Sequence, residues 1–189
     1  MLGYAFCGSF CTMKKSLEAL ESLINAGYEV QPIMSEIAYG EDSRFQSARD
    51  MRMWVEELCG RNIIHTVAEA EPLGPKSPLD AMIISPCTGN TLAKLALGIT
   101  DTAVTMAAKA HMRTSKPLLI ALATNDALSR NLQNIAAMIN RREVYFVPMR
   151  QDDPIGKPHS LVAEMDMIPE SLVMAMAGMQ PRPIFLEKS

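Results

Sequence analysis

The 189-residue sequence has little of what would tie it to a membrane or a nucleic acid. No purely apolar run is longer than the six residues of 118–123, whereas a helix needs about 20 to span a bilayer. No basic leader segment precedes the strand-like start at residue 3. Lys and Arg are scattered, and the formal net charge is −3, so no basic face is expected. We therefore expect a cytoplasmic protein that binds neither membrane nor nucleic acid.

The sequence also lacks cysteines and histidines at the spacing of metal ligands. The four cysteines, Cys7, Cys11, Cys59 and Cys87, form no paired C-x-x-C motif, and the three histidines are dispersed along the chain. Structural zinc sites need such ligands in close pairs. We expect no bound metal, and cysteines that stay as free thiols in a reducing compartment.

What the chain does have is a globular composition and a regular alternation of apolar runs with amphipathic segments. Hydrophobic residues make up 48% and charged residues 21%, which excludes wholesale disorder. Apolar runs and punctuation predict the strands and helices of a doubly wound α/β fold with a parallel sheet. The expected strands are residues 3–7, 28–34, 62–66, 81–85, 117–123 and 143–147, and the expected helices are residues 12–27, 42–59, 91–97, 101–112, 129–140 and 170–177. We expect one domain over residues 1–189, with a C-terminal extension from about residue 150 packing on it.

Two of the predicted strand ends carry small polar residues. Residues 7–12 read Cys-Gly-Ser-Phe-Cys-Thr and open a helix, where free amides suit a phosphate. One glycine is weaker than a dinucleotide fingerprint, so a plain tight turn remains an equal alternative. Residues 85–91 read Ser-Pro-Cys-Thr-Gly-Asn-Thr and hold more polar groups than a helix cap needs. Ligands of such folds bind at the carboxyl ends of the strands, so both turns are candidates.

A third candidate loop follows the last expected strand, at residues 150–160. Arg150, Lys157 and His159 offer cationic groups for a dianionic substrate. His159 is our candidate general acid or base because histidine titrates near neutral pH. Lys157 is our candidate for binding a substrate carboxylate. A solvated loop without a role remains open for each of these residues.

Residues 80–101 resemble the signature of the homo-oligomeric flavin-containing cysteine decarboxylase superfamily. That signature reads roughly A-D-x-x-[VI]-[AS]-P-x-[ST]-A-N-T-[LI]-x-K-[IL]-A-x-G-x-x-D, and here Gly89 replaces its alanine. The resemblance implies a Rossmann-like or flavodoxin-like three-layer sandwich that binds FMN. The residues that it implies at the FMN are Gly8, Ser9, Phe10, Ser35, Pro86, Thr88, Gly89, Asn90, Thr91 and Asn125.

Within that superfamily the chain is most similar to the B-subunit family of two-subunit dipicolinate synthases, through residues 8–12, 69–76 and 152–160. This resemblance implies a role in oxidising dihydrodipicolinate to dipicolinate, a small dicarboxylate, in the mother cell of a spore-forming bacterium. It implies a separate A subunit that carries a nicotinamide cofactor, without which this chain is inactive. It also implies a trimer or a multiple of trimers. The small residues of 102–112 suggest close packing between subunits.

Departures from the signature leave other functions open. The decarboxylases place a histidine shortly before the aspartate equivalent to Asp80, but Pro72 and Leu73 stand there and His65 lies earlier. Of their P-x-M-N-x-x-M motif, residues 122–128 keep only Asn125. An independent flavin-dependent decarboxylase or flavin prenyltransferase is therefore a weaker alternative. A non-catalytic FMN-binding or scaffold subunit is another.

Overall fold

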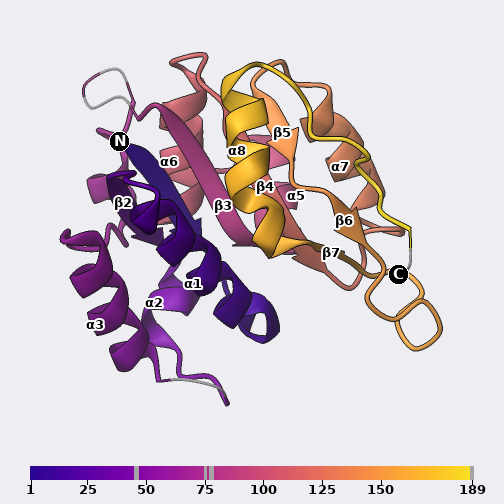
Figure 1. Cartoon of the computed structure of the whole chain (residues 1–189), viewed down its shortest axis with the longest axis horizontal. Coiled ribbons are helices and arrows are strands. Elements are labelled where there is room, and N and C mark those ends of the chain that lie inside the picture. The colour runs from indigo at the N-terminus through magenta and orange to yellow at the C-terminus, as the bar shows by residue number, and fades with distance from the viewer. Residues whose placement is uncertain (45–46, 75, 77–78, 188–189) are drawn as a thin grey trace.

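The computed structural model describes residues 1–44, 47–74, 76 and 79–187 (Figure 1). A seven-stranded sheet forms its centre, and its parallel strands follow the order β2-β1-β3-β4-β5. This is the strand order of flavodoxin-like folds, so the predicted fold class is confirmed. The parallel strands are β1 (Leu2–Phe6), β2 (Val30–Met34), β3 (Ala81–Cys87), β4 (Leu118–Thr124) and β5 (Val144–Phe146).

An antiparallel ribbon extends the sheet, which the sequence pattern does not predict. Its strands are β6 (Met149–Arg150) and β7 (Leu161–Ala163). β5 pairs with the first half of β4, whereas β7 pairs with the end of the same strand through Ala123 and Thr124. The ribbon therefore holds the loop between β6 and β7 beside the carboxyl end of β4.

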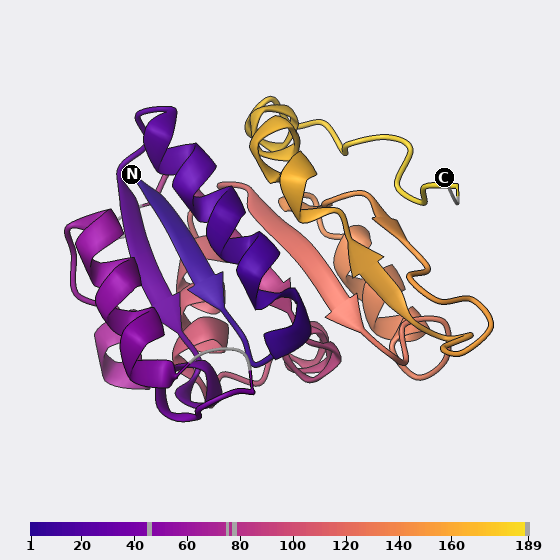
Figure 2. The same cartoon turned by 60° about the horizontal axis from the view of Figure 1, so that its bottom comes forward.

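Helices cover both faces of the sheet (Figures 1 and 2). α1 and α8 lie together on one face, where α8 contacts both α1 and β4, and α5, α6 and α7 lie on the other. β3 is buried along its whole length because it has a strand on each side and helices above and below. The helices are α1 (Phe10–Asn25), α2 (Glu36–Gly40), α3 (Ala48–Cys59), α4 (Val67–Ala70), α5 (Gly89–Leu97), α6 (Ala103–Met112), α7 (Leu132–Ile139) and α8 (Ile168–Met176), with a 3₁₀ turn, η1, at Met165–Met167.

The strand predicted at residues 62–66 is wrong, because only an isolated bridge joins Ile64 to Ile33 of β2. Side chains take up the backbone amides on either side of that bridge. The Ile63 amide donates to a Glu56 carboxylate oxygen at 3.0 Å, and the His65 amide donates to Glu69 at 3.1 Å. β2 consequently lies at the edge of the sheet, which is where a strand tolerates a proline such as Pro32.

Three predicted helix starts also need correction. Ser9 rather than Thr12 stands at the N-cap of α1, and Thr102 rather than Asp101 caps α6. α3 begins at Ala48 and not near residue 42, because the Ser47 hydroxyl accepts a hydrogen bond from the Asp50 amide. In each case the true cap is a serine or threonine, and the expected start lies within three residues of it for α1 and α6 but further away for α3.

The small residues of α6 pack inside the chain and do not form the subunit contact that we inferred from them. Most of this helix is buried against α4, α5 and the sheet. A Cβ atom on Gly74 would lie 2.8 Å from the Ala110 carbonyl oxygen, so the backbones approach closely there. Small side chains on α6 thus serve close packing within one chain.

In the ranges that the structure describes, no helix has the length and apolar character needed to cross a membrane. Nor do those ranges bring together three or more His, Cys, Asp or Glu side chains that could hold a metal ion.

Candidate functional site

A cleft of about 560 Å³ opens at the carboxyl ends of β1, β3 and β4. It brings together most of the residues predicted from the three loops. Its lining comprises Gly8, Ser9, Cys11, Thr12, Lys15, Thr88, Gly89, Asn90, Ala123, Thr124, Asn125, Asp152, Lys157, Val162 and Met165. A volume of this size is typical of small-molecule and cofactor sites.

The first wall of the cleft is the start of α1. Ser9 is the N-cap residue, but its hydroxyl makes no capping hydrogen bond. Instead it lies 3.1 Å from the hydroxyl of Thr12, which donates to it. The amides in the first turn of α1 are therefore left without a side-chain acceptor, and the positive end of the helix dipole faces the cleft. An anion such as a phosphate suits this position.

The second wall is the turn between β3 and α5. The Thr88 hydroxyl caps α5 by accepting a hydrogen bond from the Thr91 amide at 3.2 Å, so this helix begins two residues before the expected start at residue 91. Asn90 and, across the cleft at the end of β4, Asn125 are exposed. Neither carboxamide has a hydrogen-bond partner in the described part of the chain. These two amides can both donate and accept, which suits the polar edge of a planar heterocycle.

Gly89 is required by a hydrogen-bonded cluster behind this wall. Asp126 accepts hydrogen bonds from the Thr124 hydroxyl at 2.5 Å and from the Asn131 amide at 2.8 Å. A Cβ atom on Gly89 would lie 2.5 Å from both of those donor atoms and 2.9 Å from the Asp126 carboxylate. The alanine of the superfamily signature therefore does not fit here without a shift of the cluster.

The same cluster holds a negative charge next to the start of α5. The hydrogen bond from Thr124 lowers the pKa of Asp126, partial burial opposes it, and the bond from Asn131 lowers it further. Asp126 is therefore ionised at neutral pH. A ligand anion is repelled from the start of α5, which leaves the start of α1 as the favoured position for it.

Beneath the cleft lies a buried floor of thiols. The Thr91 hydroxyl donates to the sulfur of Cys7 at 3.3 Å. Burial raises the pKa of Cys7 to about 11, and burial together with the neighbouring Cys7 raises that of Cys87 well above its ordinary value. Both thiols stay protonated at neutral pH, so neither is a nucleophile.

Three of the residues predicted to bind the cofactor support the cleft from outside its lining. Thr91 contacts Cys7 in the floor, and the Pro86 carbonyl accepts a hydrogen bond from the Cys7 amide at 3.2 Å. Ser35 caps α2, where its hydroxyl accepts from the Ala38 amide at 3.3 Å, and its own amide donates to Phe6. Their roles in binding a cofactor stay predictions.

The third wall comes from the loop between β6 and β7. Lys157 donates to an Asp152 carboxylate oxygen at 3.0 Å, and the other oxygen accepts from the buried Ser160 hydroxyl at 2.6 Å. Burial alone would raise the pKa of Asp152, but the hydrogen bonds from Ser160 and Lys157 lower it below its ordinary value. The same contact raises the pKa of Lys157. This ion pair fixes the ammonium group at the edge of the cleft.

The other two cationic candidates of that loop lie elsewhere. The His159 side chain is exposed and is not part of the cleft lining, while its backbone carbonyl accepts from the Leu128 amide at 2.9 Å. Arg150 forms an ion pair with Glu164 at 2.7 Å. The structure thus brings only Lys157 of the three into the cleft. It adds Lys15, which sequence reasoning missed because a lysine on an amphipathic helix carries no local signal.

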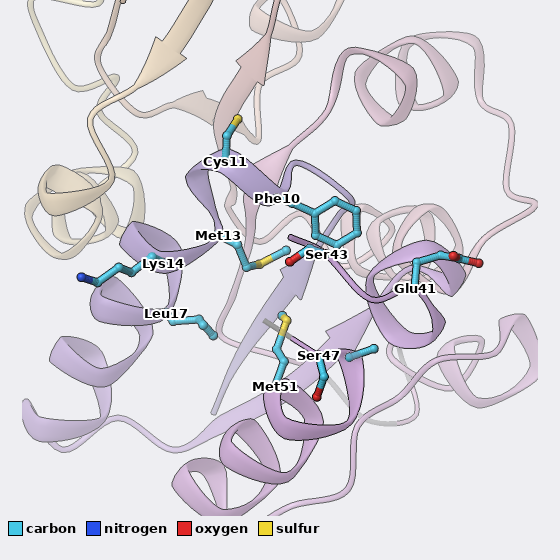
Figure 3. A pocket seen from close by; sticks show the side chains of 10 residues that line it. Phe10, Cys11, Met13, Lys14, Leu17, Glu41, Ser43, Ser47 and Met51 are labelled. Atoms are coloured by element: carbon cyan, nitrogen blue, oxygen red, sulfur yellow. The ribbon is translucent and has the colours of Figure 1, made fainter. Parts of the chain in front are cut away.

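A second cavity of about 360 Å³ lies on the other side of α1, between that helix and α3 (Figure 3). Phe10 lines this cavity rather than the cleft. Met13, Leu17 and Met51 give it an apolar floor, and Lys14 stands on its rim. The start of α1 therefore separates two cavities, and Phe10 and Ser9 belong to different ones.

Comparison with known proteins agrees with this architecture. Residues 2–174 match the family model described as Flavoprotein. The chain belongs to the Flavoprotein family. It is 39% identical over 186 residues to the dipicolinate synthase B subunit of Bacillus subtilis (strain 168), a match that covers 98% of this chain and 93% of that protein. The resemblance inferred from the sequence is thereby confirmed.

Solved structures share this fold. The crystal structure of the dipicolinate synthase B subunit from Bacillus halodurans superposes with a TM-score of 0.91 at 37% identity, covering 100% of this chain and 96% of that one. The FMN-dependent cysteine decarboxylase SpaF superposes with a TM-score of 0.66 at 18% identity, covering 94% and 95%. The latter likeness shows a shared fold alone.

Proposed function

We propose that this Flavoprotein family member is the flavin-binding B subunit of a dipicolinate synthase. In this proposal it holds FMN while a nicotinamide-carrying A subunit completes the oxidation of dihydrodipicolinate to dipicolinate. The observation that carries the proposal is the cleft at the carboxyl ends of β1, β3 and β4 in a chain 39% identical to such a protein over 98% of its length. We place the activity in the mother-cell cytoplasm of a sporulating bacterium, in keeping with the source of that relative.

The residues present in the cleft fit FMN. The uncapped first turn of α1, with Gly8 and Ser9, would take the phosphate. The unpartnered amides of Asn90 and Asn125 would meet the polar edge of the ring. When bound, FMN supplies a group that accepts a hydride, and aromatisation of a dihydropyridine ring favours losing one.

The described residues that line the cleft offer binding groups, and none of them is a histidine. Lys157 and Lys15 offer positive charge, and the polar side chains offer hydrogen bonds. Among the described residues that line the cleft, the carboxylate of Asp152 is already engaged by Ser160 and Lys157. We therefore infer that the A subunit supplies the group that removes the ring proton, which explains why the isolated chain would be inactive.

The geometry does not favour an independent decarboxylase. His65 is the histidine nearest in sequence to the position that the decarboxylases use, but its ring stacks on Tyr39 with centroids 3.9 Å apart. Its Nδ1 atom lies 3.4 Å from a Glu69 carboxylate oxygen. Neither His65 nor these partners line the cleft.

Titration of the purified chain with FMN tests the cofactor assignment. We expect saturable binding that Ser9→Glu weakens at least tenfold, because the new carboxylate would repel a phosphate at the start of α1. Ser22→Glu adds the same charge to the exposed end of that helix and should leave FMN affinity unchanged. Equal affinity in the wild-type chain and both variants would contradict the assignment of the phosphate to α1.

Reconstitution tests the two-subunit hypothesis. We expect no dipicolinate from the chain alone and dipicolinate formation once the A subunit and its nicotinamide cofactor are added, measured by the ultraviolet absorbance of the aromatic product. His159→Ala should leave turnover within about twofold, because the side chain lies outside the cleft. A loss of about 10²-fold in that variant would restore His159 as a general acid or base. Full activity of the isolated chain would refute the hypothesis that the A subunit is required.

A further inference from the structure

The cleft carries two lysines that enter from different walls. Lys15 projects from the second turn of α1, and Lys157 projects from the loop between β6 and β7. With Asp152 they are the charged side chains among the described residues that line the cleft. Asp152 pairs with Lys157, and the ionised Asp126 lies behind Gly89 at the start of α5, so the surplus positive charge of the lining is that of Lys15, on the α1 side. The surplus favours an anionic ligand.

The two cations differ in how they are held. Asp152 accepts one hydrogen bond from the Lys157 ammonium group, at 3.0 Å, and is itself fixed by Ser160. An ammonium group has three N–H donors, so Lys157 keeps donors for a ligand while its position is set. Lys15 has no ion-pair or hydrogen-bond partner in the part of the chain that the structure describes. It is therefore available to a ligand oxygen without breaking an existing contact.

Apolar surface accompanies these charges. Ala123 of β4 and Val162 of β7 pair across the antiparallel junction, and both line the cleft. A flat ring can pack on such a surface while charged substituents reach outward to cations. The cleft therefore offers an apolar patch together with two separate positive groups.

We propose that Lys15 and Lys157 form a two-point clamp for a planar ring that carries two carboxylates. The clamp would recognise one carboxylate from each wall and so distinguish a ring dicarboxylate from the corresponding monocarboxylate. This inference rests on the proposed function, which supplies the substrate class, and it adds the residues that select that class. Asp152 acts as the positioning residue for Lys157.

Isothermal titration of the full chain tests the clamp, with pyridine-2,6-dicarboxylate and pyridine-2-carboxylate as probes in buffer free of divalent metal ions. We expect the wild-type chain, saturated with FMN, to prefer the dicarboxylate. Lys15→Met and Lys157→Met should each weaken dicarboxylate binding about tenfold or more, since each removes a charge-assisted hydrogen bond. Monocarboxylate affinity should change less, so the preference between the two probes should collapse.

Lys14→Met is the matched control, because Lys14 neighbours Lys15 on α1 but stands on the rim of the second cavity (Figure 3). It should leave both affinities unchanged. An equal loss of dicarboxylate affinity in all three variants would show that the effect depends on net charge alone, and it would overturn the clamp. Absence of dicarboxylate binding to the wild-type chain, with or without FMN, would also overturn it.

Parallel titrations with FMN and riboflavin separate this inference from the proposed function. If Lys15→Met weakens FMN but not riboflavin and leaves the dicarboxylate unaffected, Lys15 binds the flavin phosphate and the clamp is wrong. If the wild-type chain binds no flavin but binds the dicarboxylate through both lysines, the flavin assignment fails while the clamp stands.

Discussion

Gly89, where the superfamily signature has alanine, packs against the hydrogen-bonded cluster formed around Asp126. Gly89→Ala would place a methyl group against the donors that hold Asp126. Overpacking of this kind costs about 1–3 kcal/mol, and we expect a loss of that size in the free energy of unfolding measured by urea denaturation. Gly40→Ala should be close to neutral, because a Cβ atom there meets nothing within 4 Å.

The double variant Gly89→Ala, Asp126→Ala decides whether the cluster is the cause. Removing the carboxylate frees the space beside the new methyl group, so the two changes together should cost less than the sum of the single ones. Additive losses would show that Gly89 is constrained by something other than Asp126.

His111 should make stability depend on pH. It is fully buried, and its Nε2 atom donates to the Pro117 carbonyl at 2.9 Å. Burial lowers its pKa below 6.5, the hydrogen bond to Pro117 opposes this, and Lys116 lowers it further. The unfolded chain therefore takes up the proton first as the pH falls below about 6.5, and the folded state loses stability in that window.

Measuring the free energy of unfolding from pH 7.5 to pH 5 checks this. We expect the wild-type chain to lose stability toward pH 5 more steeply than His111→Gln, whose amide can still donate to the carbonyl. His159→Gln, at an exposed position, should keep the wild-type slope. Identical slopes in the wild-type chain and His111→Gln would exclude His111 as the source.

At the residue scale, part of the site was predictable because strand ends of a parallel sheet converge. Ser9, Thr88 and Asn125 follow separate predicted strands and meet in one cleft as expected. Lys15 was not predictable, since Lys14 beside it has the same local context. Only the way α1 packs against β3, η1 and α8 decides which of the two faces the cleft.

The loop between β6 and β7 depends on one buried hydroxyl. Ser160→Ala would leave an Asp152 carboxylate oxygen without its partner at 2.6 Å. Losing a hydrogen bond to a charged group costs about 1.5–3 kcal/mol, so local opening should increase roughly 10- to 150-fold. Hydrogen exchange of the Gly156 and Lys157 amides measures this opening, because both donate to Asp153 within the loop.

Ser22→Ala, on the exposed side of α1, is the control for that measurement. Unchanged exchange of the Gly156 and Lys157 amides in Ser160→Ala would mean that the loop holds its shape without the contact to Asp152.

At the scale of helices and strands, the length of a strand determined whether the sequence pattern could predict it. β3 and β4 each carry seven residues, almost all of them buried, and their apolar runs were evident. β6 and β7 have two and three residues, too few for any periodicity. Their pairing follows from contacts with β4 that are distant in sequence. Residues 62–66 showed the opposite error: two adjacent isoleucines suggested a strand, but side chains accept hydrogen bonds from the amides of Ile63 and His65.

At the scale of the whole molecule, self-association of the chain remains a prediction. The residues that favour it are no longer those of α6. α6 packs within the chain, but the end of α5 exposes Leu97 and Ile99, at 73% and 43%. Adjoining exposed apolar side chains favour contact with another protein surface. We expect light scattering to give a mass above that of one chain, and Leu97→Glu to reduce it.

Met53→Glu introduces the same charge at an exposed methionine of α3, 58% accessible, and should not alter the mass. A single-chain mass for the wild type at micromolar concentration would refute the oligomer.

β5 and β7 both pair with β4, one at its first half and the other at its end, and this arrangement affects the order in which parts of the molecule can fold. The parallel sheet is complete at Phe146, yet the third wall of the cleft comes from residues 149–163, which a ribosome releases later. Domains acquire structure as the chain emerges, and contacts between distant positions form slowly because a long loop must close first. The sheet can therefore fold before the binding site exists, and the ribbon completes the cleft by docking on the end of β4 after the parallel strands have been synthesised.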